Sequence, residues 1–301
     1  MKEPNFFIVG APKCGTTALY AYLRGHPSIF MPRLKEPHFF ASDIRDIRGS
    51  IRVLEEYLRL FKKANKKHLA VGEASSSYIF SKVAIQNIRE FNPQAKLIAM
   101  VRNPLEMIHS YHNQLLFSHF EDEKDFEEAW RLQDARLRGE RVPLTCLDPK
   151  ILIYRDIAKQ GEQVERMLQS FPSDQVKVIV FDDFKSSVRS VYNHVLEFLG
   201  VPSDVRIDFP TVNVSKVHRF ERLARFLRQP PFFIEIILRG IKRVFRVRGT
   251  GLGSLLLRAS TKPIKREPLA PTFRRSLVQE FREDVELLSE MLNRDLSHWL
   301  K

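Results

Sequence analysis

The chain has 301 residues, 44% of them apolar, which is enough for a sizeable core in one α/β domain. Its 49 Lys and Arg residues against 36 Asp and Glu residues give a formal net charge of +13, which indicates an anionic partner. Two cysteines, Cys14 and Cys146, argue against a disulfide scaffold, and without a signal peptide or an apolar run of about 20 residues the expected location is cytoplasmic.

Apolar strand patterns alternate with helical patterns along the chain. In order they predict a strand over 6–10, a helix over 16–25, a helix over 51–66, strand-then-turn units at 68–75 and 95–104, a helix over 105–118, a strand over 175–184, a helix near 187–199 and a helix-rich end over 271–301. This alternation predicts an α/β fold with a mostly parallel central sheet flanked by helices. We interpret 1–301 as a single domain, with the basic stretch 205–270 as an irregular excursion.

Charged residues come at the ends of four predicted strands: Lys13, Glu73, Arg102 and Asp182. Ligands of parallel α/β sheets bind beyond the carboxyl ends of the strands. The recurrence therefore predicts a shared site at that edge of the sheet.

The segment GAPKCGTT (10–17) connects the first strand to the first helix and contains the residues of an anion-binding loop. It differs from the usual nucleotide-binding loop, because Lys13 precedes the second glycine, Gly15, instead of following it. Backbone N–H groups around Gly15 and the helix N-terminus can converge on an anion. With Lys13 as a cation and Thr16 and Thr17 as hydroxyl donors, the loop can hold a phosphate without a metal ion. The alternative is an ordinary turn with a solvated lysine.

A second segment, VRNPLEMIHSYHNQL (101–115), places Arg102 at a strand end and Ser110 on the following helix. Arginine offers a forked and permanently charged set of donors to a phosphate. Together the two segments resemble sulfotransferases that use 3′-phosphoadenosine 5′-phosphosulfate (PAPS). The resemblance implies a P-loop-NTPase-like sulfotransferase fold and a cofactor site made of Lys13, Cys14, Gly15, Thr16, Thr17, Arg102 and Ser110.

The sequence LKEPHFFASD (34–43) resembles the bacterial branch of that family and the branch related to heparan sulfate sulfotransferases. The resemblance implies that Glu36 is the general base on the acceptor hydroxyl, with His38 as an assisting group or as the base itself. Two positions depart from the pattern of the polysaccharide enzymes. Ala41 stands where an Asp often follows the two phenylalanines, and Ala74 stands where a Lys is common, which weakens an assignment to heparan sulfate.

Three further features are weaker candidates. Glu73 and Ser75–Ser77 are expected near the cleft, and Asn213 and Ser215 resemble a late element near the cofactor. The amphipathic stretch 232–246 fits a lid over an acidic acceptor, a peripheral membrane contact for a lipid acceptor, or an ordinary surface helix.

The resemblance implies transfer of a sulfuryl group from PAPS to an acceptor hydroxyl or amine, with 3′-phosphoadenosine 5′-phosphate (PAP) as product. Lys13 would stabilise the departing phosphate while Glu36 takes the acceptor proton. We expect no metal, because the nine His and two Cys residues show no ligand spacing. The acceptor stays open among sugars, lipids and other small molecules.

Two other functions compete with this one. A kinase with a variant phosphate loop would need a metal-binding carboxylate after a strand, for which Asp182 or Asp183 could serve. A non-catalytic anion-binding protein would hold nucleic acid through its basic surface, but the sequence contains no recognisable reader motif, so no nucleic acid is expected. The position of Lys13 and the pairing of Arg102 with Ser110 favour the sulfotransferase.

Overall fold

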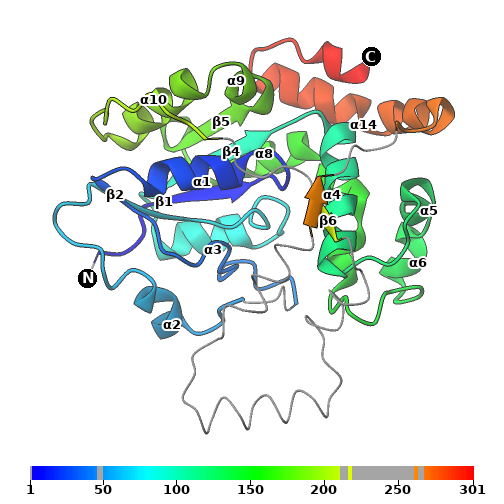
Figure 1. Ribbon diagram of the computed structural model, residues 1–301, viewed down its shortest axis with the longest axis horizontal. Helices are drawn as coiled ribbons and strands as arrows, with labels where there is room; N and C mark the ends of the chain where they lie inside the picture. The colour runs from blue at the N-terminus through cyan, green and yellow to red at the C-terminus, as the bar shows by residue number, and fades with distance from the viewer. Residues whose placement is uncertain (1, 46–49, 211–215, 219–260, 264–267) are drawn as a thin grey trace, which may run out of the picture.

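The computed structural model describes residues 2–45, 50–210, 216–218, 261–263 and 268–301 (Figure 1). Its central sheet has five parallel strands in the spatial order β2-β3-β1-β4-β5. The strands are β1 (Phe6–Gly10), β2 (Ile29–Phe30), β3 (Ala70–Ala74), β4 (Lys96–Val101) and β5 (Val176–Val180). The predicted α/β fold with a parallel central sheet is therefore confirmed.

Helices connect the strands and cover the sheet. The α-helices are α1 (Thr16–Arg24), α2 (Leu54–Arg59), α3 (Ala84–Phe91), α4 (Pro104–Ser118), α5 (Phe126–Arg131), α6 (Gln133–Leu137), α7 (Tyr154–Ala158), α8 (Gln160–Ser170), α9 (Phe181–Ser186), α10 (Val188–Leu199) and α14 (Pro271–Met291). Three short 3-10 helices are η1 (Pro149–Leu152), η2 (Ser173–Gln175) and η3 (Ser297–Leu300).

A small antiparallel ribbon lies beside α4 (Figure 1). It pairs β6 (Lys216–His218) with β7 (Thr261–Pro263). Both strands belong to the stretch 205–270, most of which lies outside the described residues.

The strands form because their sequences are almost continuously apolar. All five residues of FFIVG in β1 are buried, as a parallel sheet requires when helices cover both faces. Tyr22 of α1 and Tyr192 of α10 both contact the Phe209 ring, so these two helices share one face. Right-handed crossovers place α3 and α8, which contact each other, on the opposite face.

Several elements differ from the predicted ones. The strand predicted over 175–184 ends at Val180, and the residues that follow form α9, because Asp182 and Asp183 suit the first turn of a helix. The helix predicted over 51–66 is only the six residues of α2. The elements β2, α3 and α5 to α8 are not in the prediction, and none of them is longer than the 11 residues of α8.

The strand order brings two loops together at one edge of the sheet. β1 lies between β3 and β4, so residues that follow β3 and β4 flank the loop that follows β1. The Ala11 N–H donates to the Met100 carbonyl at 2.7 Å and holds the start of that loop against the end of β4. A ligand site is expected at this edge.

A buried ion pair anchors the helices beside α4. The side chains of Arg136 and Glu121 are fully buried and make two hydrogen bonds, at 2.7 and 2.6 Å. The Tyr154 hydroxyl donates to the same carboxylate at 2.6 Å. Burial by itself raises the pKa of Glu121, but the hydrogen bonds from Arg136 and Tyr154 bring that pKa below its ordinary value. The group ties α6 and α7 to the segment after α4.

Replacing Glu121 by Gln leaves the Arg136 charge buried without a counter-charge. We expect the free energy of unfolding to fall by about 3–5 kcal/mol, measured by urea denaturation. Glu140→Gln is the matched control, because it breaks the exposed pair with Arg138 and solvent already screens that pair. Equal denaturation midpoints for the two variants would contradict the anchoring role.

Candidate active site

A cavity of about 450 Å³ lies beyond the ends of β1 and β4. Its walls come from the β1–α1 loop, α1, the segment around Glu36, the β3–α3 loop, α4 and α9. The sequence-predicted residues that line it are Lys13, Gly15, Thr16, Thr17, Glu36, His38, Ser76, Ser77, Arg102 and Ser110. Cys14, Glu73 and Asp182 do not line it, so the prediction that all four strand-end charges share one site is wrong for Glu73 and Asp182.

The phosphate-type loop turns sharply because two of its residues have left-handed backbone conformations. Lys13 has φ 63° and Gly15 has φ 94°, and Gly15 directly precedes the first residue of α1, Thr16. The positive φ at Gly15 strains any other residue, and a Cβ there would also lie tightly, at 3.2 Å, against the rings of Phe181 and Phe184. The Gly15 carbonyl accepts from the N–H groups of Ala18 at 2.9 Å and Leu19 at 3.2 Å, so the N–H groups of Thr16 and Thr17 are the ones that precede the first bonds of the helix.

Lys13 is oriented by α4. Its ammonium donates to the Gln114 side-chain carbonyl at 2.8 Å, and Gln114 also lines the cavity. This bond places the ammonium at the cavity, where it can contact an anionic ligand.

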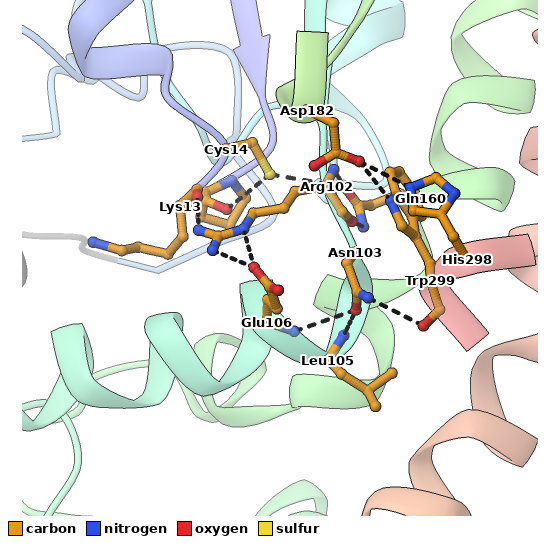
Figure 2. A network of polar contacts seen from close by, with 11 residues as sticks. Lys13, Cys14, Arg102, Asn103, Leu105, Glu106, Gln160, Asp182, His298 and Trp299 are labelled. Atoms are coloured by element: carbon orange, nitrogen blue, oxygen red, sulfur yellow. Dashed lines mark hydrogen bonds and ion pairs between the residues drawn. The ribbon is translucent and has the colours of Figure 1, made fainter. Parts of the chain in front are cut away.

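Arg102 is held at its backbone and at its guanidinium (Figure 2). The Gln160 side chain binds the Arg102 N–H at 2.9 Å and the Arg102 carbonyl at 2.7 Å. Its guanidinium lies 4.6 Å from the centre of the Phe181 ring, contacts Glu106 at 2.5 Å and donates to the Lys13 carbonyl at 3.2 Å. Arg102 and the phosphate-type loop therefore form one hydrogen-bonded unit.

Ser110 reaches the cavity from α4. The residues of α4 that line the cavity are Ser110, Tyr111, Gln114, Leu115 and Ser118. This spacing is one face of a helix. Helix α4 begins at the Asn103 cap, one residue after Arg102, so its start and its inner face serve the same cavity.

Glu36 and His38 lie in a strained loop on the far wall. Both have left-handed backbones, with φ 63° and φ 53°, which is costly for residues other than glycine. The end of β3 holds the loop: Glu36 N–H donates to the Ala74 carbonyl at 2.9 Å, and His38 N–H donates to Ser75 Oγ at 3.1 Å. Backbone strain held by specific hydrogen bonds is typical of functional sites.

The Glu36 carboxylate is ionised and oriented. Burial raises its pKa, but the charges of Lys35 and His38 and the hydrogen bonds from Lys35 and Ser76 bring the pKa below the ordinary value of 4.5. Lys35 and Ser76 both bind Oε1, while Oε2 lies 3.5 Å from His38 Nε2. One carboxylate oxygen is thus fixed and the other faces the histidine.

His38 is neutral at physiological pH. Burial is the main reason that its pKa falls from 6.5 to about 4, while the Glu36 carboxylate acts in the opposite direction. Its Nδ1 lies 2.7 Å from Ser77 Oγ, which fixes the ring. A neutral ring can exchange hydrogen bonds with Glu36 without adding a charge to the cavity.

Two nucleophilic or acidic residues near the cavity are buried beneath its walls. Cys14 has no exposed surface, and burial raises the pKa of its thiol to about 12 despite nearby Arg102 and Lys13. Glu73 is also fully buried, accepting hydrogen bonds from Tyr78 at 2.6 Å and Ser75 at 2.9 Å. Burial raises the pKa of Glu73 to about 7 against the effect of these bonds.

The structure offers no obvious metal site in the part of the chain that it describes. No group of three or more His, Cys, Asp and Glu side chains is arranged there to hold an ion. The kinase alternative would use Asp182 or Asp183. Trp299 and His298 contact Asp182, and Arg294 binds Asp183, outside the cavity.

Sequence reasoning missed several lining residues. Phe181 and Lys185 face the cavity but belong to no binding motif of the sequence, and Gln114 lies within the segment 101–115 but is not one of its predicted binding residues. Gln160, which holds Arg102, lies 58 residues away from it in sequence, and no local pattern signals that contact. Asn213, Ser215 and the stretch 232–246 lie outside the described residues. Among the described helices, none is long and apolar enough to cross a membrane.

The fold and this cavity define an α/β protein with a phosphate-type loop and a second cationic group one strand away. Residues 3–222 match the family model described as "Sulfotransferase domain", so the chain belongs to the sulfotransferase family. The predicted resemblance and the predicted sulfotransferase fold are therefore confirmed.

Relatives of known name agree with this assignment. Over 249 residues the chain is 27% identical to "Carbohydrate sulfotransferase 15" of Mus musculus, covering 66% of this chain and 44% of that protein. Over 225 residues it is 28% identical to "Bifunctional heparan sulfate N-deacetylase/N-sulfotransferase 3" of Homo sapiens, covering 72% and 24%. The chain thus spans less than half the length of these relatives. The crystal structure of a sulfotransferase from Alicyclobacillus acidocaldarius matches 100% of both chains with a TM-score of 0.72 and 28% identity.

The buried Glu73 carboxyl makes a prediction about stability and pH. Its pKa of about 7 in the fold exceeds the ordinary 4.5, so its contribution to stability is complete below about pH 4.5 and is lost as the pH rises through 7. The difference in melting temperature between Glu73→Gln and the wild type should therefore favour the variant more at pH 8 than at pH 5, by several degrees. Differential scanning calorimetry at the two pH values measures this, with the exposed Glu55→Gln as control. The same difference at both pH values would show that Glu73 does not titrate there.

Proposed function

We propose that the protein transfers a sulfuryl group from PAPS to a hydroxyl or amine of an acceptor. One observation carries the proposal: Arg102 donates a hydrogen bond at 3.2 Å to the backbone of Lys13, so two cationic side chains on neighbouring loops serve one cavity. A nucleotide with phosphates on both sides of its ribose needs this arrangement, whereas an ordinary nucleotide needs only the loop. Membership of the sulfotransferase family supports the same reaction.

The residues present fit such a donor. When bound, PAPS supplies the sulfuryl group together with a 3′-phosphate that ordinary adenine nucleotides lack. Lys13, the N–H groups at the start of α1 and the hydroxyls of Thr16 and Thr17 bind the 5′-phosphate. Arg102 and Ser110 bind the 3′-phosphate, for which the guanidinium fork is well suited. Lys13 also neutralises the charge that develops on the leaving phosphate oxygen.

Glu36 is the proposed general base. It is ionised at neutral pH, and its Oε2 is the carboxylate oxygen not bound by Lys35 and Ser76. His38, neutral and fixed by Ser77, orients this oxygen. Glu36 takes the acceptor proton while the cavity holds donor and acceptor together. Catalysis of this kind rests on positioning and electrostatics.

The acceptor side of the cavity has a mixed lining. Ser76 and Ser77 lie beside Glu36 and His38, and the apolar residues Phe80, Leu115, Phe120 and Ile151 complete the wall. The hydroxyl groups suit a sugar ring, which agrees with the carbohydrate and heparan sulfate named for two relatives, and the apolar wall suits the ring faces or a hydrophobic substituent. We propose a sugar or a small amphiphilic alcohol as acceptor.

The donor class can be tested with product nucleotides. PAP should raise the melting temperature of the protein more than AMP does, because only PAP engages Arg102 and Ser110. Arg102→Gln should lower the affinity for PAP at least about tenfold and leave that for AMP nearly unchanged, since a charge-assisted pair is lost. The exposed Arg89→Gln on α3 is the control. Equal shifts with PAP and AMP, or a shift that requires ATP with Mg²⁺, would overturn the proposal and favour a kinase.

The base can be tested by pH dependence. Because the pKa of Glu36 is below 4.5 and that of His38 is about 4, kcat/KM should stay constant down to about pH 6 and fall only below about pH 5. Glu36→Gln should reduce kcat by about 10²–10⁴-fold. The assay follows label from PAPS into the best acceptor of a panel of sugars, sterols and phenols.

An acid limb of the kcat/KM profile centred near pH 6.5 would contradict a base whose pKa lies below 4.5 and a His38 whose pKa is about 4. An acid limb of the kcat/KM profile near pH 7 that disappears in Glu73→Gln would be assigned to the buried Glu73 carboxyl, whose pKa is about 7.

A further inference from the structure

The C-terminal residues of the chain contact the ends of two sheet strands beside the cavity. Residues 294–299 follow α14 and lie against the segments that come directly after β4 and β5 (Figures 1 and 2). They lie beyond residues 3–222, which match the family model. Their contacts join the C-terminal part of the chain to the matched domain.

Trp299 joins the two strand ends. It is 2% exposed, its indole N–H donates to Asp182 Oδ2 at 2.9 Å, and its carbonyl accepts from the Asn103 side chain at 3.0 Å. Asn103 follows β4, and Asp182 is the second residue of α9, directly after β5. One buried residue thus holds both segments at a fixed separation.

The neighbouring side chains strengthen this contact. His298 Nε2 lies 3.2 Å from the same Asp182 oxygen, and Arg294 binds both oxygens of Asp183. Bidentate pairing by an arginine fixes orientation as well as distance. Three residues of the C-terminal segment therefore hold the first turn of α9.

One of the two segments that Trp299 joins carries Arg102 itself, and the other carries Phe181, whose ring lies against the Arg102 guanidinium. Asn103 is the next residue after Arg102, and its side-chain oxygen also caps α4. Asp182 is the next residue after Phe181, whose ring lies 4.6 Å from that guanidinium. A change at Trp299 would thus move the base of the arginine, the ring beneath it, or both.

A second connection runs from α14 to Arg102. The Asp284 carboxylate accepts hydrogen bonds from Gly161 N–H and Glu162 N–H, both at 2.9 Å, at the start of α8. The residue just before them, Gln160, holds the Arg102 backbone at 2.9 and 2.7 Å. The C-terminal part of the chain therefore reaches Arg102 by two separate routes.

We propose that Trp299 is a positioning residue that sets the preference of the cavity for nucleotides with a 3′-phosphate. The inference rests on the proposed function, in which Arg102 binds that phosphate. Trp299 does not line the cavity and touches no ligand. It acts by keeping the Arg102 backbone and the Phe181 ring at the separation that aims the guanidinium. Trp299 acts on the arginine side of the cavity, so binding of the 5′-phosphate by the loop around Gly15 is expected to be unaffected.

The test uses Trp299→Phe, which keeps an aromatic ring in the buried position and removes the N–H donor to Asp182. Trp130→Phe on α5 is the matched control, because Trp130 also packs on aromatic rings of α14 and lies outside the cavity lining. Isothermal titration calorimetry measures the dissociation constants of PAP and AMP for the full-length wild type and both variants. The two ligands differ only in the 3′-phosphate.

We expect Trp299→Phe to weaken PAP binding about tenfold and AMP binding less than about twofold, since small misplacements of a binding group are costly. Trp130→Phe should leave the PAP-to-AMP ratio unchanged. A general loss of stability would weaken the binding of both nucleotides equally and leave this ratio unchanged. A loss shared equally by PAP and AMP would therefore identify a merely structural role and overturn the inference.

A second variant covers the case in which Trp299→Phe does not fold. Asn103→Ser keeps a good helix cap for α4 but removes the donor to the Trp299 carbonyl, and the same selective loss of PAP affinity is expected. If the wild type itself binds PAP no better than AMP, the proposed function fails. If the wild type prefers PAP and both folded variants keep the full preference, the positioning role alone fails.

Discussion

The adjacency of β1 and β4 is the constraint on which the rest of the site depends. A hydrogen bond of 2.7 Å from Ala11 to Met100 joins the ends of these strands, and the Arg102 guanidinium then reaches the Lys13 carbonyl at 3.2 Å. Parallel strands end at the same edge, so the loop after one strand and the arginine after the next become neighbours without any contact between distant surfaces. The strand order of the sheet therefore sets the approximate distance between the two cations, and side-chain contacts make only small adjustments to it.

Positive charges gathered at one cavity repel one another, and their local partners reduce this cost. Arg102 lies on the Phe181 ring and against Glu106, whose side chain is 60% exposed. Solvent screens an ion pair of that kind, so the guanidinium can exchange the carboxylate for a ligand phosphate at small expense. The Lys13 ammonium donates to the side-chain amide oxygen of Gln114, which orients it at the cavity. The same cavity is thus stable without a ligand and suited to an anion.

The sequence predicted those parts of the site that lie within short motifs. The loop around Gly15, the Arg102–Ser110 pair and the Glu36–His38 segment all line one cavity. The first two directly follow strands β1 and β4, and hydrogen bonds to the end of β3 hold the third. Position in sequence could not tell which strand-end charges face the cavity. Neither Glu73 nor Asp182 lines the cavity: Glu73 is enclosed by tyrosine and serine hydroxyls, and the partly exposed Asp182 binds Trp299 and His298.

Long-range contacts escaped sequence reasoning for a physical reason. Local periodicity reports which face of an element is apolar, but it does not report which distant residue meets that face. Gln160 reaches Arg102 across 58 residues, and Trp299 reaches Asn103 across 196. The end of β5 was likewise missed, because acidic residues after an apolar run suit a strand end and a helix start equally well. Residues of this kind surround the functional groups without touching the ligand site.

The wall opposite the two cations is held by hydrogen bonds to serine hydroxyls and to the backbone, and its loop has a strained backbone. Glu36 and His38 both have left-handed backbones, and the hydrogen bonds of Ala74, Ser75, Ser76 and Ser77 hold them there. Position 74 contributes only its backbone carbonyl, and the cation beside the carboxylate comes instead from Lys35 in the same loop. Because the loop supplies both the carboxylate and its counter-ion, the charge balance of this wall does not depend on β3. The acceptor wall can therefore change its outer, apolar lining without disturbing the ionised state of Glu36, while the cationic wall is tied to the sheet and the C-terminal segment.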